Sequence, residues 1–107
     1  GPLIAKGMFD VALLLGQNTK IEVRRKEEKH LLNRYIAVLK NHGVDGLTFD
    51  LVWDDYRRCN LYNWVYAAVV AGTLDPSNEA GRAWMGQMVA RQSSVSEDLE
   101  VFNLLPS

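Results

Sequence analysis

The sequence predicts an all-α fold of about five helices that form one small domain over residues 1–107. Apolar residues recur at three- and four-residue spacing through most of the chain, which is typical of helices with one buried face. No segment alternates apolar and polar residues as a half-buried strand does. Glycines, prolines and helix-capping residues then divide the chain into helical pieces joined by short connections.

The first helix is expected over about residues 7–17, and its apolar side chains surround it. They are Met8, Phe9, Val11, Ala12, Leu13, Leu14 and Leu15. A helix that is apolar on all sides is usually buried on all sides. Asp10 is the only acidic residue in the first 16 and would need hydrogen-bond donors if buried. Two interpretations stay open: Asp10 caps the amides of this helix, or it accepts hydrogen bonds from a loop in another segment.

The second helix is expected over residues 20–41. Thr19 and Glu22 have the spacing of a capping box, in which each side chain accepts from the other residue's amide. The run 24–29 is almost entirely charged and predicts a solvated face. Gly43 suits the left-handed position that ends a helix.

The third helix is expected over residues 49–71, with Thr48 as its cap. Residues 62–71 contain one polar side chain, Asn63, and this half is predicted to be deeply packed. A turn at residues 75–78 leads into a fourth helix that ends near residue 92. Residues 94–97 again have capping-box spacing and predict a short fifth helix through residue 104, which Pro106 terminates.

The composition is that of an ordinary soluble domain. Hydrophobic residues make up 48% and charged residues 23%, and the formal net charge is −1, so no global field favours nucleic acid or an anionic membrane. The single cysteine, Cys59, excludes an internal disulfide and fits a reducing, cytoplasmic location. No apolar run is long enough to span a membrane, and no signal peptide is recognisable. Gly1-Pro2 is either native or a remnant of tag cleavage.

The residues of metal-ligating or nucleophilic type do not form a site by their spacing. His30 and His42 lack a cysteine or carboxylate at zinc-ligand spacing, so no metal site is expected. Cys59 lies in an aromatic helix with no histidine nearby in sequence, which favours a buried and inert thiol.

Two adjacent carboxylates, Asp54 and Asp55, also fail to make an acid–base pair, because a helix points neighbours about 100° apart. At helical spacing they are expected to form surface ion pairs with Arg57 or Arg58. The mixed-sign run at residues 24–28 is expected to be solvated rather than phosphate-binding.

Four landmarks occur in order along residues 7–57. They are Gly-Met-Phe-Asp-Val-Ala-Leu-Leu-Leu at 7–15, a charged helix containing residues 28–35, Gly43-Val44, and Trp-Asp-Asp-Tyr-Arg at 53–57. As an ordered set they resemble the aminoglycoside phosphotransferase and choline kinase-like family, especially its ecdysteroid-kinase-like branch. The resemblance covers roughly residues 1–60, and the remainder matches only in helical character. It implies the C-terminal part of a protein-kinase-like C-lobe.

The resemblance implies that the family's catalytic residues lie before residue 1, so that this chain holds none of them. In such kinases one Asp activates the substrate hydroxyl and another binds magnesium. ATP and Mg²⁺ are therefore implied for a parent protein, not for this chain, which also lacks the nucleotide-binding lysine and the glycine-rich loop. By resemblance, Asp10 braces the catalytic loop, and Trp53, Tyr56 and Arg57 wall the acceptor pocket. For these three, an aromatic core anchor with a surface arginine is an equally good interpretation.

Two classes of function are compatible with these residues. The first is the helical subdomain of an ATP-dependent small-molecule phosphotransferase, whose partners are the rest of the kinase fold and a hydroxylated substrate. The alternative is a self-contained helical binding or oligomerisation module, because five capped helices can form a bundle unaided. In the first case the isolated chain is expected to self-associate or to swap its first helix, because that helix would expose apolar surface.

Overall fold

The computed structural model describes residues 2–73 and 77–106, with side chains described from residue 7 onward. The elements are α1 (Pro2–Gln17), α2 (Ile21–Asn41), α3 (Phe49–Thr73), α4 (Glu79–Asp98) and a 3₁₀ helix, η1 (Val101–Leu104). The described ranges contain no strand, so the all-α prediction is confirmed. The number of α-helices is four rather than five. No helix in these ranges has the length and apolar character needed to cross a bilayer.

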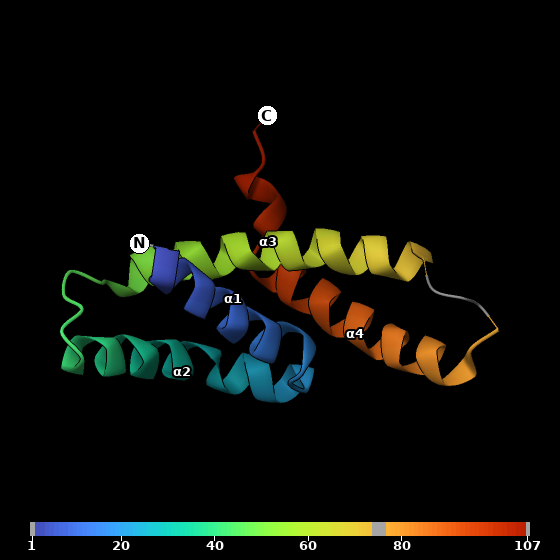
Figure 1. Ribbon diagram of the computed structural model, residues 1–107, viewed down its shortest axis with the longest axis horizontal. Coiled ribbons are helices and arrows are strands. Elements are labelled where there is room, and N and C mark those ends of the chain that lie inside the picture. The colour runs from blue at the N-terminus through green and yellow to red at the C-terminus, as the bar shows by residue number, and fades with distance from the viewer. Residues whose placement is uncertain (1, 74–76, 107) are drawn as a thin grey trace.

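Consecutive helices run in opposite directions and form an elongated bundle of 50 × 32 × 23 Å (Figure 1). In that view α1 lies between α3 and α2, and α4 crosses beneath α3. The α3–α4 hairpin extends to one end of the molecule beyond α1 and α2, while η1 projects from the other side of α3. Two helices therefore build that end alone.

The apolar core is divided in the same way. The main core lies where α1, α2, α3 and α4 meet, and it includes Met8, Leu15, Leu32, Val52 and Val95. A second, smaller cluster lies between α3 and α4 only, and consists of Ala67, Met85 and Met88 with half-buried valines beside them.

The second half of α3 is much more exposed than predicted. Tyr62, Val65, Tyr66 and Val69 are each about half to two-thirds exposed, so the expectation of a deeply packed segment is wrong. The reason is the length of the neighbouring helices, because only α4 continues alongside α3 there. Apolar composition predicts burial only where enough partner helices are present.

Helix α1 starts at Pro2, earlier than expected, and is buried on one side only. Met8, Ala12 and Leu15 are in the core, whereas Leu14 is largely exposed and Phe9 partly so. The prediction that α1 is enclosed on every side is therefore wrong for the chain as described.

The charged first half of α2 is not wholly solvated either. Arg24 is only 1% exposed and Glu28 only 6%. Sequence reasoning assigned both to a solvated face, because a charged run usually is one. Their mutual ion pair, and partners on α3 and α4, make this burial tolerable.

Several helix ends follow the predicted chemistry. The Leu51 amide donates to the Thr48 hydroxyl at 3.2 Å, and Gly43 adopts a positive φ of 89° after α2. The first capping box is wrong: α2 has Lys20 as its N-cap without a side-chain bond, and the Thr19 hydroxyl donates backwards to the Leu14 carbonyl at 2.7 Å.

The predicted break before residue 94 is also wrong, because α4 continues to Asp98. Ser94, the expected cap, lies within α4, and its hydroxyl accepts a hydrogen bond from the Arg25 guanidinium of α2 at 3.2 Å. Glu100, in the left-handed conformation at φ 50°, separates α4 from η1. Within the predicted turn at 75–78, Asn78 caps α4 by accepting from the Gly81 amide at 2.8 Å. Residues 75 and 76, like Gly1, lie outside the described residues.

Candidate functional site

A buried ionic network joins α2 to α3. The hydroxyl of Tyr56 donates to the Glu28 carboxylate at 2.6 Å, and the Arg24 guanidinium donates to the same Glu28 oxygen at 3.0 Å. All three side chains are in the core. One carboxylate oxygen thus satisfies two buried donors, which is the condition under which a charge can be kept inside a small protein.

The network continues to the end of α4 through a second carboxylate. Arg24 also donates to Asp98 at 2.6 Å, and Arg25 donates to the same oxygen at 2.8 Å. The hydrogen bond from Arg25, together with the charge and hydrogen bond of Arg24, lowers the pKa of the Asp98 carboxyl. Arg24 therefore ties two carboxylates from different helices and sets the packing of α2 against α4.

The protonation of Tyr56 follows from this environment. Burial raises the pKa of its hydroxyl above the ordinary value of 10.0, and the negative charge of Glu28 raises it further. The hydroxyl is a neutral donor at physiological pH and has no access to solvent. The arrangement is suited to holding helices together rather than to transferring protons to a substrate.

A layer of amide side chains lies deeper between α1, α3 and α4. Gln92 donates to the side-chain oxygen of Asn60 at 3.1 Å and accepts from Gln17 at 3.1 Å. Gly16 lies against this layer, and a Cβ there would come within 2.8 Å of the Asn60 oxygen. The close approach explains why a glycine occupies this position of α1.

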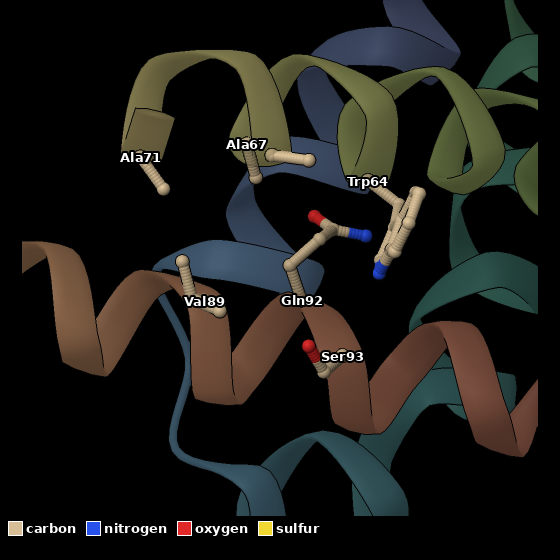
Figure 2. A pocket seen from close by; sticks show the side chains of 7 residues that line it. Trp64, Ala67, Ala71, Val89, Gln92 and Ser93 are labelled. Carbon is tan, nitrogen blue, oxygen red and sulfur yellow. The ribbon is translucent and has the colours of Figure 1, made fainter. Parts of the chain in front are cut away.

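A small pocket opens beside the amide layer, between α3 and α4. Figure 2 shows Gln92 extending from α4 toward α3, with Trp64 and Ala67 on the facing helix. The pocket has a volume of about 110 Å³ and mostly apolar walls, completed by Val89 and Ser93. It is smaller than the roughly 150 Å³ of an apolar cavity known to hold benzene.

The predicted pocket-wall residues Trp53 and Tyr56 lie together, with ring centroids 5.6 Å apart. Trp53 also stacks on Phe49 at 5.4 Å, and the Lys29 ammonium lies 5.6 Å from its ring. Tyr56 is fully buried, so a substrate could not reach it in this structure. The placement of this pair is that of an aromatic core anchor.

Arg57, the third predicted wall residue, contacts the C-terminal end of α4. Its guanidinium donates to the backbone carbonyls of Leu99 at 2.7 Å and Glu100 at 3.0 Å. These carbonyls end α4 and need donors that the helix itself cannot supply. Arg57 thus fixes the turn between α4 and η1 against α3.

Asp10, the predicted brace, is exposed on α1. It has no hydrogen bond or ion pair with any described residue, so the interpretation of Asp10 as a cap of α1 is wrong. Its side chain is also not buried. Its nearest electrostatic neighbour is Tyr35 of α2, whose pKa is raised by burial and then by the charge of Asp10. The Tyr35 hydroxyl packs closely on α1, because a Cβ on Gly7 would lie 2.6 Å from it.

Tyr35 also lines a groove between α1 and α2, with a volume of about 240 Å³. The residues of this α1–α2 groove are Val11, Leu14, Leu15, Leu31, Arg34, Tyr35 and Val38. Sequence reasoning treated its apolar side chains as core. The available signal was a stripe of apolar residues at 31, 35 and 38, which lies beside the buried Leu32 on the same helix and widens its apolar face.

Cys59 and the two adjacent aspartates, Asp54 and Asp55, behave as predicted from the sequence. Cys59 is buried, and burial, followed by the charge of Asp55, raises the pKa of its thiol to about 11. Asp55 lies 3.5 Å from Arg58, and Asp54 lies 3.9 Å from Arg57, which confirms the surface ion pairs.

Residues 2–73 and 77–106 contain no group of three or more carboxylate, histidine or cysteine side chains that could hold a metal ion. Comparison with protein-family models, with curated proteins and with solved structures gives no match to this chain.

Proposed function

We propose that this chain is the C-terminal helical subdomain of an ATP-dependent small-molecule phosphotransferase, in which it acts as a scaffold and supplies Asp10 as a brace. One observation carries the proposal. Asp10 is an exposed carboxylate without a partner among the described residues, and it lies on the helix that forms one wall of the apolar α1–α2 groove.

The surroundings of Asp10 support contact with another protein segment. Leu14, on the same helix, exposes apolar surface, and Leu31 and Val38 do so across the groove on α2. Apolar patches of this kind usually mark interaction sites. A carboxylate beside such a patch provides a strong acceptor for the backbone N–H groups of a docked loop. In the proposal that loop is the catalytic loop of the kinase fold.

Asp10 is then a positioning residue, and the reacting groups belong to the rest of the protein. ATP and Mg²⁺ bind outside this chain, and the acceptor is a small molecule with a hydroxyl group. Trp53 and Arg57 contribute through packing, because each is engaged within the subdomain. This division accounts for a chain whose buried ion pairs are satisfied internally while the carboxylate of Asp10 faces outward on α1.

The test compares Asp10→Asn with Asp54→Asn in the gene product that contains this segment. Nucleotide-dependent phosphorylation of a panel of hydroxylated compounds is measured for both variants. We expect Asp10→Asn to lower kcat about tenfold or more, because the amide is a weaker acceptor than the carboxylate. In the 107-residue chain alone the same change should alter the free energy of unfolding by less than about 0.5 kcal/mol, since the side chain is exposed.

Asp54→Asn is the matched control, because Asp54 is also an exposed helical carboxylate. Equal effects of the two variants on kcat would refute the bracing role. Absence of phosphotransfer with every hydroxylated compound, at full nucleotide occupancy, would contradict the proposed activity itself.

A second candidate function is a self-contained helical binding module, and the buried networks favour it. The Arg24 network and the amide layer connect all four α-helices through side chains of this chain alone. Cooperative two-state unfolding of the isolated chain is expected if the module is self-contained. Broad, non-cooperative unfolding would instead favour a subdomain that depends on additional protein.

A further inference from the structure

We infer that a second copy of this chain docks on the exposed face of α3 and forms a two-fold symmetric, antiparallel helix pair. The docking surface is the α3 stripe, defined as Tyr62, Val65, Tyr66 and Val69. This inference does not depend on the proposed phosphotransferase function, because it uses a different face of the molecule from Asp10 and the α1–α2 groove.

The α3 stripe has the periodicity of a helix–helix contact. Tyr62, Val65 and Val69 follow one another at three- and four-residue spacing, with Tyr66 beside them. The exposed fraction is 66% for Tyr62, 48% for Val65, 64% for Tyr66 and 60% for Val69. The opposite face of α3 is already occupied, since Asn60, Asn63 and Ala67 are buried against the bundle. Apolar side chains at this spacing pack helices at a crossing angle of about 20°.

The area is sufficient for a dimer. An aromatic side chain offers about 150–250 Å², so the two tyrosines at about two-thirds exposure present roughly 130 Å² each. With the valines, one copy contributes about 400 Å² from these four side chains, and two copies about 800 Å². The flanking surface of Arg58 and Phe9 brings the total to the ~1,000 Å² that a specific interface requires.

Charge favours a second copy over a charged partner. Between Arg58 and Asp75 the sequence contains no charged side chain, so the stripe offers nothing for an acidic or basic partner to pair with. The net charge of the chain is only −1, and two copies therefore repel each other weakly. Exposed tyrosines in an uncharged patch have the composition of the centre of a protein–protein interface.

The order of large and small residues specifies the symmetry. The N-terminal part of the exposed face carries Arg58 and Tyr62, and its C-terminal part carries Ala68, Val69 and Gly72. In an antiparallel pair with its two-fold axis at Val65, Tyr62 of one copy faces Ala68 of the other. Arg58 likewise faces Gly72, beside which a Cβ would meet nothing within 4 Å. Arg58 and Tyr62 thus each meet a small residue across the axis, which suits a self-complementary isologous contact.

A hollow at the N-terminal end of the stripe fits the same arrangement. It has a volume of about 160 Å³ and is lined by Phe9, Asp55, Arg58, Cys59 and Tyr62. Phe9 of α1 contacts Tyr62 with ring centroids 6.0 Å apart, so the hollow has a firm aromatic wall. The antiparallel register brings the methyl groups of Val69 from the second copy to this hollow.

The test measures the dissociation constant of the 107-residue chain by sedimentation velocity from about 1 to about 300 µM. We expect a dimer, and we expect Val65→Glu to raise the dissociation constant about 100-fold or more, because two carboxylates would meet at the axis. Trp84→Glu is the matched control, since Trp84 is 57% exposed on α4 and lies outside the stripe. It should dimerise like the wild type.

A second variant reports the symmetry directly. In a Cys59→Ala background, Val65→Cys should form an intermolecular disulfide under mild oxidation, because a residue on the axis lies opposite itself. Trp84→Cys in the same background should not form this dimer efficiently.

Three results would overturn the inference. The first is a wild-type chain that stays monomeric at the highest concentration. The second is a dimer that Val65→Glu leaves intact and Leu14→Glu dissociates, which would place the interface at the α1–α2 groove. The third is a dimer in which Val65→Cys forms no disulfide while the circular dichroism spectrum remains that of the wild type.

Discussion

Replacement of Glu28 by alanine should be among the most destabilising single replacements of a charged residue in this protein. The carboxylate accepts from Tyr56 at 2.6 Å and from Arg24 at 3.0 Å in the core. Its removal leaves the Arg24 guanidinium, which is 1% exposed, with only part of its partners. Breaking one side of a buried ion pair costs about 3–5 kcal/mol. For a protein whose total stability is about 5–15 kcal/mol, this is a large fraction.

The assay is urea unfolding followed by circular dichroism, with Glu27→Ala as the matched control. Glu27 is the adjacent residue of α2, is only half-buried, and has no hydrogen bond or ion pair with a described residue. Its replacement should change the free energy of unfolding by less than about 0.5 kcal/mol. If Glu28→Ala and Glu27→Ala differ by less than about 1 kcal/mol, the buried network does not stabilise the fold as argued.

A double variant separates the value of the ion pair from the cost of an orphaned charge. Replacing both Arg24 and Glu28 by methionine removes the two charges together and keeps apolar volume in the core. We expect this variant to be more stable than Glu28→Ala, because no unpaired guanidinium remains. A double variant less stable than the single one would show that Arg24 has favourable interactions with Asp98 that outweigh its desolvation.

Three further changes have defined outcomes. Burial raises the pKa of the Tyr56 hydroxyl above 10.0, so the contribution of this hydroxyl to stability is complete below pH 10 and is lost as the pH rises further. Tyr56→Phe should abolish this loss of stability at alkaline pH, measured by thermal unfolding from pH 8 to about pH 11. The Cys59 thiol, with its pKa raised to about 11, should react with a disulfide reagent at pH 8 about 100-fold more slowly in the folded chain than in urea, and equal rates would contradict its burial. Arg57→Met should lower the free energy of unfolding by about 1–2 kcal/mol through the loss of two carbonyl contacts, whereas Arg58→Met, at an exposed surface pair, should change it by less than about 0.5 kcal/mol.

The fold class could be predicted from the sequence, because helix periodicity and capping are local properties. Thr48 and Gly43 act where the local chemistry places them. The second capping box is wrong because the hydroxyl of Ser94 accepts from Arg24 and Arg25 of α2, while α4 continues past it. A capping motif competes with the continuing helix, and only the packing of α4 decides between them.

The burial of individual charged and apolar side chains could not be predicted. Arg24 and Glu28 are in the core because Tyr56 and Asp98, which are distant in sequence, provide their hydrogen bonds. Conversely, Tyr66 is exposed although its stretch of α3 is apolar, because only α4 continues alongside the C-terminal end of α3. Both outcomes depend on which helices are neighbours, and that information is not local.

The candidate site shows the same limit. Trp53, Tyr56 and Arg57 are predicted as a pocket wall only through the family resemblance of the motif at residues 53–57. Adjacent residues of a helix point in different directions, so the motif divides between an aromatic cluster and the end of α4. Asp10 stands out in the sequence as a lone acid among apolar residues, and this irregularity corresponds to an exposed carboxylate without a hydrogen bond or ion pair among the described residues.

The amide layer has a consequence for how this sequence can diverge. Asn60 and Gln92 satisfy each other away from solvent, with Gln17 as a third member. A hydrocarbon substitution at one position would leave the other with unmet polar atoms, whereas simultaneous replacement of both would not. Homologues should therefore change these positions together, and the residue at position 16 should enlarge only in lineages where the amides have already gone.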